Sequence, residues 1–164
     1  MKSERVNERD LEWVEDAFGE GHAWKRKRLS LAAGAHKLGC SLYELPPRKR
    51  PWPYHYHVAN EEAIYVLSGS GRLSTPAGEM PLCVGDYVVL PAGEEGAHEL
   101  LNTGDEPLRF LFLSTMIEPD ITVQPRSGKL GVFGGSAPGG DPNRRTVGGF
   151  FHRDAAVEYW EGEE

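Results

Sequence analysis

The feature that most constrains the fold is a series of short strand-like segments between residues 37 and 115, separated by clusters of turn residues. They recur at a spacing of about 8 to 12 residues, which is typical of all-β sandwiches and barrels. No stretch with helical periodicity interrupts the series, so a parallel sheet built from βαβ units is disfavoured. The expected strands cover residues 40–45, 53–57, 62–68, 71–75, 79–82, 86–90, 98–102 and 108–114.

The chain of 164 residues is expected to form a single domain with three regions. Residues 1–36 are an N-terminal arm, residues 37–115 the β-barrel core, and residues 116–164 a C-terminal extension. In the arm, Leu11, Val14 and Phe18 would share one face of a helix that begins after Asn7 as its cap. Residues 11–13 suit a short strand equally well.

The C-terminal extension contains two strand-like segments, residues 121–123 and 129–133, and then a glycine- and proline-rich stretch. This stretch, residues 134–149, has the composition of a mobile loop. The segment 155–160 (AAVEYW) ends in Tyr159 and Trp160, which a free tail would leave in water. We therefore expect it to dock on the barrel or on a partner subunit, and we expect a homodimer.

The charge of the chain narrows the choice of partners. A formal net charge of −7 opposes nonspecific binding to nucleic acid and to anionic membranes. The basic run at residues 25–28 could contact a phosphate or a nucleic acid, but we interpret it as a solvated edge because nothing else in the chain is basic. No apolar run approaches the ~18 residues needed to span a bilayer. The N-terminus lacks the apolar core of a signal peptide, which predicts a cytoplasmic protein.

Two cysteines, Cys40 and Cys83, are too few for a disulfide scaffold in a chain of this size. Both lie in apolar, strand-like segments. We expect them to be buried free thiols.

Three histidines and two neighbouring glutamates suggest a metal site. His55 and His57 alternate on an expected strand, so their side chains share one face. Glu61 and Glu62 open the next strand, but both faces of that strand are apolar, so periodicity does not choose between them. Together with His98 they would suit Zn, Fe, Mn, Ni or Cu better than calcium. The alternative is a β-hairpin whose histidines are structural.

The spacing of these residues resembles the two motifs of the cupin superfamily. Residues 55–69 match the first motif, in which H-x-H is followed after four residues by glutamate and after six more by glycine; this spacing selects Glu62. Residues 85–102 match the second motif, which runs from a glycine through P-x-G to a histidine and an asparagine. The resemblance covers residues 38–115 and implies a double-stranded β-helix, a small jelly-roll barrel with N- and C-terminal extensions. It also implies that His55, His57, Glu62 and His98 bind one divalent transition metal.

The sequence departs from the cupin pattern at two places. Lys49 stands where the first motif opens with a glycine, and the proline-rich segment 46–53 is expected to replace that turn. Residues 94–97 lengthen the second motif by two residues, which could displace His98. Because the interval from His98 to Asn102 is intact, we expect the extra residues to bulge outwards.

The resemblance extends to small single-domain cupins of unassigned function, some of which carry the label sugar-phosphate isomerase. It implies a metalloenzyme acting on a small polar molecule such as a sugar phosphate. Tyr43, Tyr54 and Glu99 are the candidates for proton transfer. The same ligands serve iron- or copper-dependent dioxygenases and non-catalytic binding or sensor modules, which remain alternatives.

Overall fold

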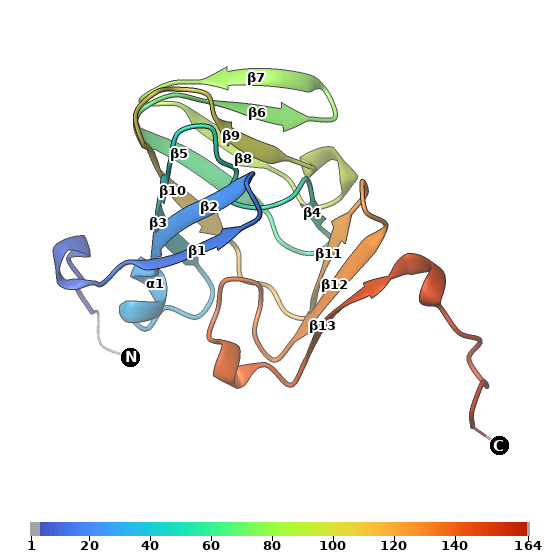
Figure 1. Ribbon diagram of the computed structural model, residues 1–164. Helices are drawn as coiled ribbons and strands as arrows, with labels where there is room; N and C mark the ends of the chain where they lie inside the picture. The colour runs from blue at the N-terminus through green and yellow to red at the C-terminus, as the bar shows by residue number, and fades with distance from the viewer. Residues whose placement is uncertain (1–3, 164) are drawn as a thin grey trace.

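The computed structural model describes residues 4–163 and consists mainly of antiparallel β-sheet (Figure 1). Thirteen strands form sheets of six, four and three strands. Among these residues the only α-helix is the short α1 (Leu29–Ala32), and none of the helices has the length and apolar character needed to cross a membrane. Single 3-10 turns are η1 (Glu8–Asp10), η2 (Glu94–Gly96), η3 (Pro142–Arg144) and η4 (Arg153–Ala155). The expected all-β architecture is confirmed.

The six-stranded sheet forms one wall of the barrel and includes part of the N-terminal arm. Its strand order is β1-β2-β3-β10-β5-β8. The arm joins the sheet because β2 pairs with β3 over Lys25–Lys27. The strands are β1 (Val14–Phe18), β2 (His22–Lys27), β3 (Gly39–Leu45), β10 (Leu108–Ser114), β5 (Glu62–Ser68) and β8 (Tyr87–Leu90).

The two smaller sheets complete the barrel and attach the C-terminal extension to it (Figure 1). One has the order β7-β6-β9, with β7 (Gly78–Leu82), β6 (Gly71–Thr75) and β9 (Glu99–Asn102). The other has the order β13-β12-β11-β4, with β13 (Val147–His152), β12 (Lys129–Gly134), β11 (Asp120–Gln124) and β4 (Tyr56–His57). The extension therefore pairs with the strand that carries His57.

The core lies between the sheets and consists of inward-facing side chains from alternate strand positions. Ile64, Leu108 and Phe110 are completely buried, as expected for alternation along β5 and β10. Burying one such side chain contributes about 1.5–3 kcal/mol. Phe110 stacks on Tyr43 with the ring centroids 5.3 Å apart, and Tyr43 in turn reaches the cavity described below.

In the arm, both alternatives are wrong: the helix is limited to one 3-10 turn, and residues 11–13 are not a strand, since β1 begins only at Val14. The side chain of Asn7 accepts a hydrogen bond from the Arg9 backbone N–H at 3.0 Å, so it does cap a turn, but that turn ends at Asp10. Val14 and Phe18 then belong to β1 and are exposed.

The C-terminal extension differs from expectation at its end. Residues 155–160 do not dock on the barrel: Val157, Tyr159 and Trp160 are 70%, 84% and 74% exposed, and the segment after β13 projects away from the sheets (Figure 1). Docking on a second subunit stays a prediction.

The glycine-rich stretch contains buried Ser136 and Ala137, and its last residues belong to β13. Both cysteines are free thiols, as expected, but neither is buried. Cys40 is half-buried and Cys83 is exposed.

Candidate metal centre

His55 and His98 face each other because their backbones form an isolated antiparallel bridge. The His55 N–H donates to the His98 carbonyl at 3.1 Å, and the His98 N–H donates to the His55 carbonyl at 2.8 Å. Directly opposed residues of an antiparallel pair project to the same side. The ring centroids consequently lie 4.7 Å apart.

The backbone also fixes which nitrogen of each ring points into the site. In the neutral ring, His55 Nδ1–H donates to the Pro53 carbonyl and His98 Nδ1–H donates to the Gly96 carbonyl, each at 2.9 Å. The lone pair of each ring is then on Nε2, the free nitrogen that a metal ligand presents. Both histidines are therefore held in a ligating tautomer by their own turns.

Glu62, the first residue of β5, provides a carboxylate between the histidines. Its Oε1 lies 3.4 Å from His57 Nε2 and its Oε2 lies 3.8 Å from His98 Nε2. The ligand atoms of His55, Glu62 and His98 all lie within 4.8 Å of one another. His57 adjoins this triad through Glu62, with its ring centroid 5.2 Å from that of His55.

Asp120 of β11 orients His57 from outside the triad. His57 Nδ1–H donates to Asp120 Oδ2 at 2.6 Å, and Asp120 Oδ1 accepts from the Ala59 N–H at 3.0 Å. The carboxylate is almost completely buried. A carboxylate behind an imidazole fixes the tautomer and increases the basicity of the opposite nitrogen. Asp120 is thus a functional residue that the sequence did not indicate.

Burial and neighbouring charge set the protonation of the group. Burial, reinforced by His98 and His57, holds the pKa of His55 well below 6.5. Burial lowers the pKa of His98 to about 4 and raises the pKa of Glu62 to about 7. Burial also disfavours charge on His57, but the hydrogen bond to Asp120 and the nearby Glu62 outweigh it and raise its pKa.

The side chains of His55, Glu62 and His98 are suited to bind a divalent metal ion. Glu62 Oε2 and His98 Nε2 are both buried and have no hydrogen-bond partner among the described residues. Unpaired buried polar atoms are costly unless they serve a ligand. Two neutral imidazoles and a carboxylate aimed at one point are a typical donor set for a first-row transition metal.

The longer second motif does not displace His98. Residues 94–96 form the 3-10 turn η2, and the carbonyl of its last residue, Gly96, is the acceptor that orients the His98 ring. A Cβ at Gly96 would collide with the Pro91 carbonyl oxygen, so glycine is required for this close approach. The extra residues are accommodated in the loop, as expected.

The missing glycine of the first motif is replaced by a turn at residues 46–49. The Lys49 N–H donates to the Pro46 carbonyl at 3.2 Å, and Arg48 adopts a left-handed φ of 64°. Its guanidinium donates to the Thr103 carbonyl and to Asp105, at 2.7 and 2.8 Å. These contacts stabilise the left-handed conformation of Arg48, which a glycine would adopt without strain.

His55 and Glu62 of the triad, together with His57, line a cavity of about 150 Å³, which we call the central cavity. Trp52 and Phe112 form one wall, with their ring centroids 4.6 Å apart. Serine hydroxyls and the Arg26 guanidinium make other parts of the lining polar. Its lining comprises Arg26, Ser30, Gly39, Cys40, Ser41, Tyr43, Trp52, His55, His57, Glu62, Phe112, Ser114, Met116, Pro138 and Gly139.

The sequence model of the cupin domain matches residues 41–114, the segment that carries His55, Glu62 and His98. Residues 41–114 form a cupin domain. The double-stranded β-helix expected from the two motifs is confirmed. No curated protein sequence matches this chain.

Solved structures with the cupin fold cover nearly the whole chain. A protein of Acidithiobacillus ferrooxidans that carries the provisional name sugar phosphate isomerase is 24% identical, with a TM-score of 0.77 over 94% of this chain and 95% of its own. A Silicibacter pomeroyi protein named sugar phosphate isomerase is 21% identical, with a TM-score of 0.76 over 96% and 98%. The polyketide cyclase RemF of Streptomyces resistomycificus is 27% identical, with a TM-score of 0.55 over 70% and 78%.

Only one of the three candidates for proton transfer lines the central cavity. Tyr43 does, and its hydroxyl accepts a hydrogen bond from Arg26 Nη1 at 3.2 Å. Tyr54 instead lies under the guanidinium of Arg126, 4.5 Å from its ring centre. Glu99 pairs with Arg126 at 2.8 Å and does not line the cavity.

Proposed function

We propose that this cupin is a metal-dependent enzyme acting on a small polar molecule, with isomerisation of a sugar phosphate as its reaction class. The observation that carries the proposal is the His55/Glu62/His98 triad: Glu62 Oε2 and His98 Nε2 are buried and unpaired, and His55 and Glu62 line a partly polar cavity. The names of the two full-length structural neighbours support the reaction class. Because one fold hosts many activities, the site and not the fold has to be tested.

We propose His57 as the fourth ligand beside the triad, through its Nε2 atom, with Asp120 holding the proton on Nδ1. A divalent metal bound there supplies Lewis-acid polarisation of a carbonyl or hydroxyl oxygen. The aromatic wall of Trp52 and Phe112 excludes water from this end of the cavity.

Tyr43 is placed to supply the proton that an isomerisation requires. Burial raises the pKa of its hydroxyl, more than the nearby Arg26 lowers it, so the phenol stays protonated at neutral pH. Since Arg26 donates to the Tyr43 oxygen, the phenolic hydrogen is free to point into the cavity. Tyr43 then acts as a general acid.

The ligand assignment is tested by metal analysis of matched variants. His57→Ala and Glu62→Ala should abolish metal binding while the circular dichroism spectrum of the barrel is retained. Glu61→Ala removes the adjacent, exposed carboxylate and should keep full occupancy. Full metal occupancy in His57→Ala or Glu62→Ala would contradict the assignment, as would a wild-type protein that neither contains metal nor is stabilised by it.

The reaction is tested by NMR with sugar phosphates in deuterated water. Wild-type protein should incorporate deuterium at the carbon next to the carbonyl, and Tyr43→Phe should reduce the rate about 100-fold or more without changing metal occupancy. Equal rates in the two proteins would remove Tyr43 from the mechanism. Oxygen consumption by the ferrous protein in place of isomerisation would favour a dioxygenase.

A further inference from the structure

The arginines of this acidic protein divide into two groups. Six arginines among residues 4–163 are half-buried. Three of them pair with a carboxylate at 3.2, 3.0 and 3.5 Å: Arg50, Arg72 and Arg109. The other three, Arg26, Arg28 and Arg145, form no ion pair within the described residues. Half-buried charges without a counter-charge need an explanation, because burial disfavours them.

Of the three unpaired arginines, Arg26, on β2, lines the central cavity. Arg28 follows two residues later, just beyond the end of β2, and its buried Nε has no hydrogen-bond partner among the described residues. Arg145 approaches from the C-terminal extension, where its Nη2 donates to the Ala137 carbonyl at 3.5 Å. Burial lowers the pKa of Arg28, and the positive charges of Arg26 and Arg145 lower it further, so both of these arginines lie near Arg28.

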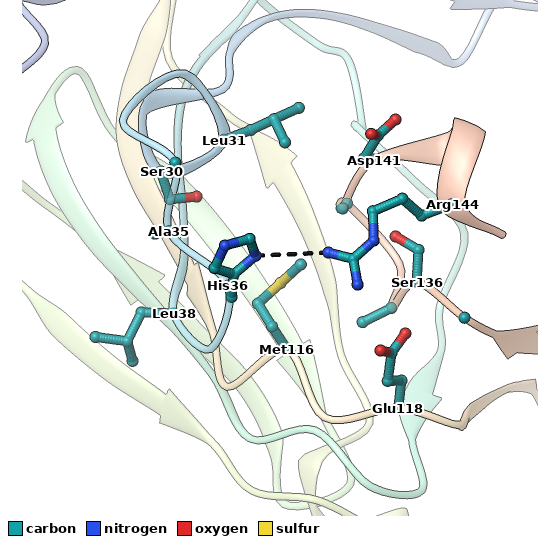
Figure 2. A pocket seen from close by; sticks show the side chains of 15 residues that line it. Ser30, Leu31, Ala35, His36, Leu38, Met116, Glu118, Ser136, Asp141 and Arg144 are labelled. Atoms are coloured by element: carbon teal, nitrogen blue, oxygen red, sulfur yellow. Dashed lines mark hydrogen bonds between the residues drawn. The ribbon is translucent and has the colours of Figure 1, made fainter. Parts of the chain in front are cut away.

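A second cavity, which we call the side cavity, adjoins the central one. Its volume is about 140 Å³, and it shares Ser30, Met116 and Gly139 with the central cavity. Figure 2 shows Arg144 and His36 pointing toward one another in it, and Arg144 Nη1 lies 3.5 Å from His36 Nδ1. Arg144 also forms no ion pair within the described residues, so a fourth unpaired arginine lines the side cavity.

Two carboxylates lie nearby, but neither forms an ion pair with these cations within the described residues. Asp141 is close enough to raise the pKa of Arg28, yet its Oδ1 accepts from the Asn143 N–H at 3.0 Å. Glu118 lines the side cavity. Four guanidinium groups against two carboxylates leave this region positive in a chain whose net charge is −7. Such a local excess of one sign in a cavity attracts ions of the opposite sign.

We propose that Arg26, Arg28, Arg144 and Arg145 bind the phosphate group of a phosphate monoester whose reacting end lies at the His55/Glu62/His98 triad. The inference rests on the function proposed above and adds to it the place and the residues of phosphate recognition. The phosphate lies where the two cavities adjoin at Ser30 and Gly139.

The number of guanidinium groups favours a phosphate over a carboxylate. One arginine fork satisfies both oxygens of a carboxylate, whereas a phosphate monoester carries three acceptor oxygens and nearly two negative charges. The Ser30 hydroxyl adds a neutral donor at the junction. Arginine suits this role because its fork donates pairs of hydrogen bonds to phosphate oxygens.

The test is calorimetric titration of metal-stripped protein with inorganic phosphate, in EDTA at low ionic strength. Wild-type protein should bind phosphate, and Arg28→Gln and Arg145→Gln should each weaken binding about tenfold or more, the effect of one charge-assisted hydrogen bond. Arg109→Gln changes the net charge equally but removes an arginine paired with Glu8, and should change the affinity less than about twofold. Equal losses in all three variants, or no phosphate binding by wild type, would overturn the proposal.

Two further measurements distinguish a phosphate site from arginines with only a structural role and from a carboxylate site. Arg28→Gln should raise the melting temperature at low salt, because it relieves repulsion, whereas an arginine with only a structural role would lower it. Acetate should compete with phosphate weakly, and equal displacement by acetate would overturn the assignment to phosphate. Because phosphate binding is measured without metal, an inactive protein that takes up no metal would refute the proposed enzyme function alone.

Discussion

Asp120 offers the sharpest test of the candidate metal centre, because it affects a proposed ligand without being one. Its two carboxylate oxygens accept from two different donors, His57 Nδ1–H at 2.6 Å and the Ala59 N–H at 3.0 Å. In Asp120→Asn one oxygen becomes an NH₂ group, which cannot accept. Whichever way the amide turns, one of the two donors loses its acceptor inside a buried site.

The size of the effect follows from the bond that is lost. A hydrogen bond to a charged group contributes about 1.5–3 kcal/mol, which corresponds to about 10- to 100-fold in metal affinity. The metal-free Asp120→Asn protein should also lose free energy of unfolding of the same order. Asn matches Asp in size, so the packing around β11 is preserved.

The assay is competition for Zn²⁺ and Mn²⁺ against a chromophoric chelator, together with thermal melts in EDTA. Asp105→Asn is the matched control: it removes the same charge from an exposed carboxylate that pairs with Arg48. The control should leave metal affinity unchanged. If Asp120→Asn bound both ions as tightly as wild type, the hydrogen bond to His57 would have no part in metal binding, and His57 would lose its place among the ligands.

The predicted homodimer should give twice the mass of the chain in light scattering at micromolar concentration, and a monomeric full-length protein would contradict the prediction. Removing residues 153–164, which include the exposed Tyr159 and Trp160, should shift the protein towards the monomer. Phe110→Ala should lower the free energy of unfolding by about 3–5 kcal/mol in urea denaturation, because the ring is completely buried, whereas Leu67→Ala on the exposed side of β5 should cost far less. Asp86 raises the pKa of the Cys83 thiol, so its thiolate fraction at pH 8 is smaller than that of an ordinary cysteine and grows as the pH rises. Asp86→Asn should therefore speed alkylation by iodoacetamide at pH 8, and an unchanged rate would argue against this coupling.

Local patterns in the sequence were sufficient to predict most strands of the barrel. β5, β6 and β10 begin and end at the expected residues, because β5 and β10 are mainly apolar runs and β6 is a short segment with turn residues before and after it. Strand alternation alone did not predict that His55 lies close to His98. That prediction came from the spacing of the two cupin motifs. The contact between the two histidines depends on an isolated backbone bridge, which no periodicity reveals.

Contacts with the C-terminal extension could not be predicted from local patterns. Asp120 lies 63 residues beyond His57 in the sequence, and nothing in the segment DITVQ distinguishes it from any other acidic residue at the start of a strand. For the aromatic end of the chain, docking on the barrel is wrong, because Tyr159 and Trp160 are exposed in the single chain, and docking on a second subunit stays a prediction. The composition of a segment indicates whether it favours burial, but it does not show which other segment it contacts.

The basic run at residues 25–28 shows a signal that was present but not used. On a strand, Lys25 and Lys27 share one face, and they pair with Glu15 and Glu8 at 3.7 and 3.0 Å. Arg26 is on the other face and lines the central cavity, whereas Arg28 lies just beyond the end of β2. The interpretation as a solvated edge holds for Lys25 but not for Arg26. Alternation along the strand would have separated Arg26 from the two lysines.

The pairing of β11 with β4 makes the C-terminal extension part of the thermodynamics of the metal centre. Thr122 and Val123 pair with His57 and Tyr56, and Asp120 holds the His57 ring. A metal ion that binds more tightly when the ring is held must, by linkage, stabilise the docked extension against local opening by the same free energy. Metal loading should therefore slow backbone amide exchange with solvent in β11 and β12, although neither strand provides a proposed ligand.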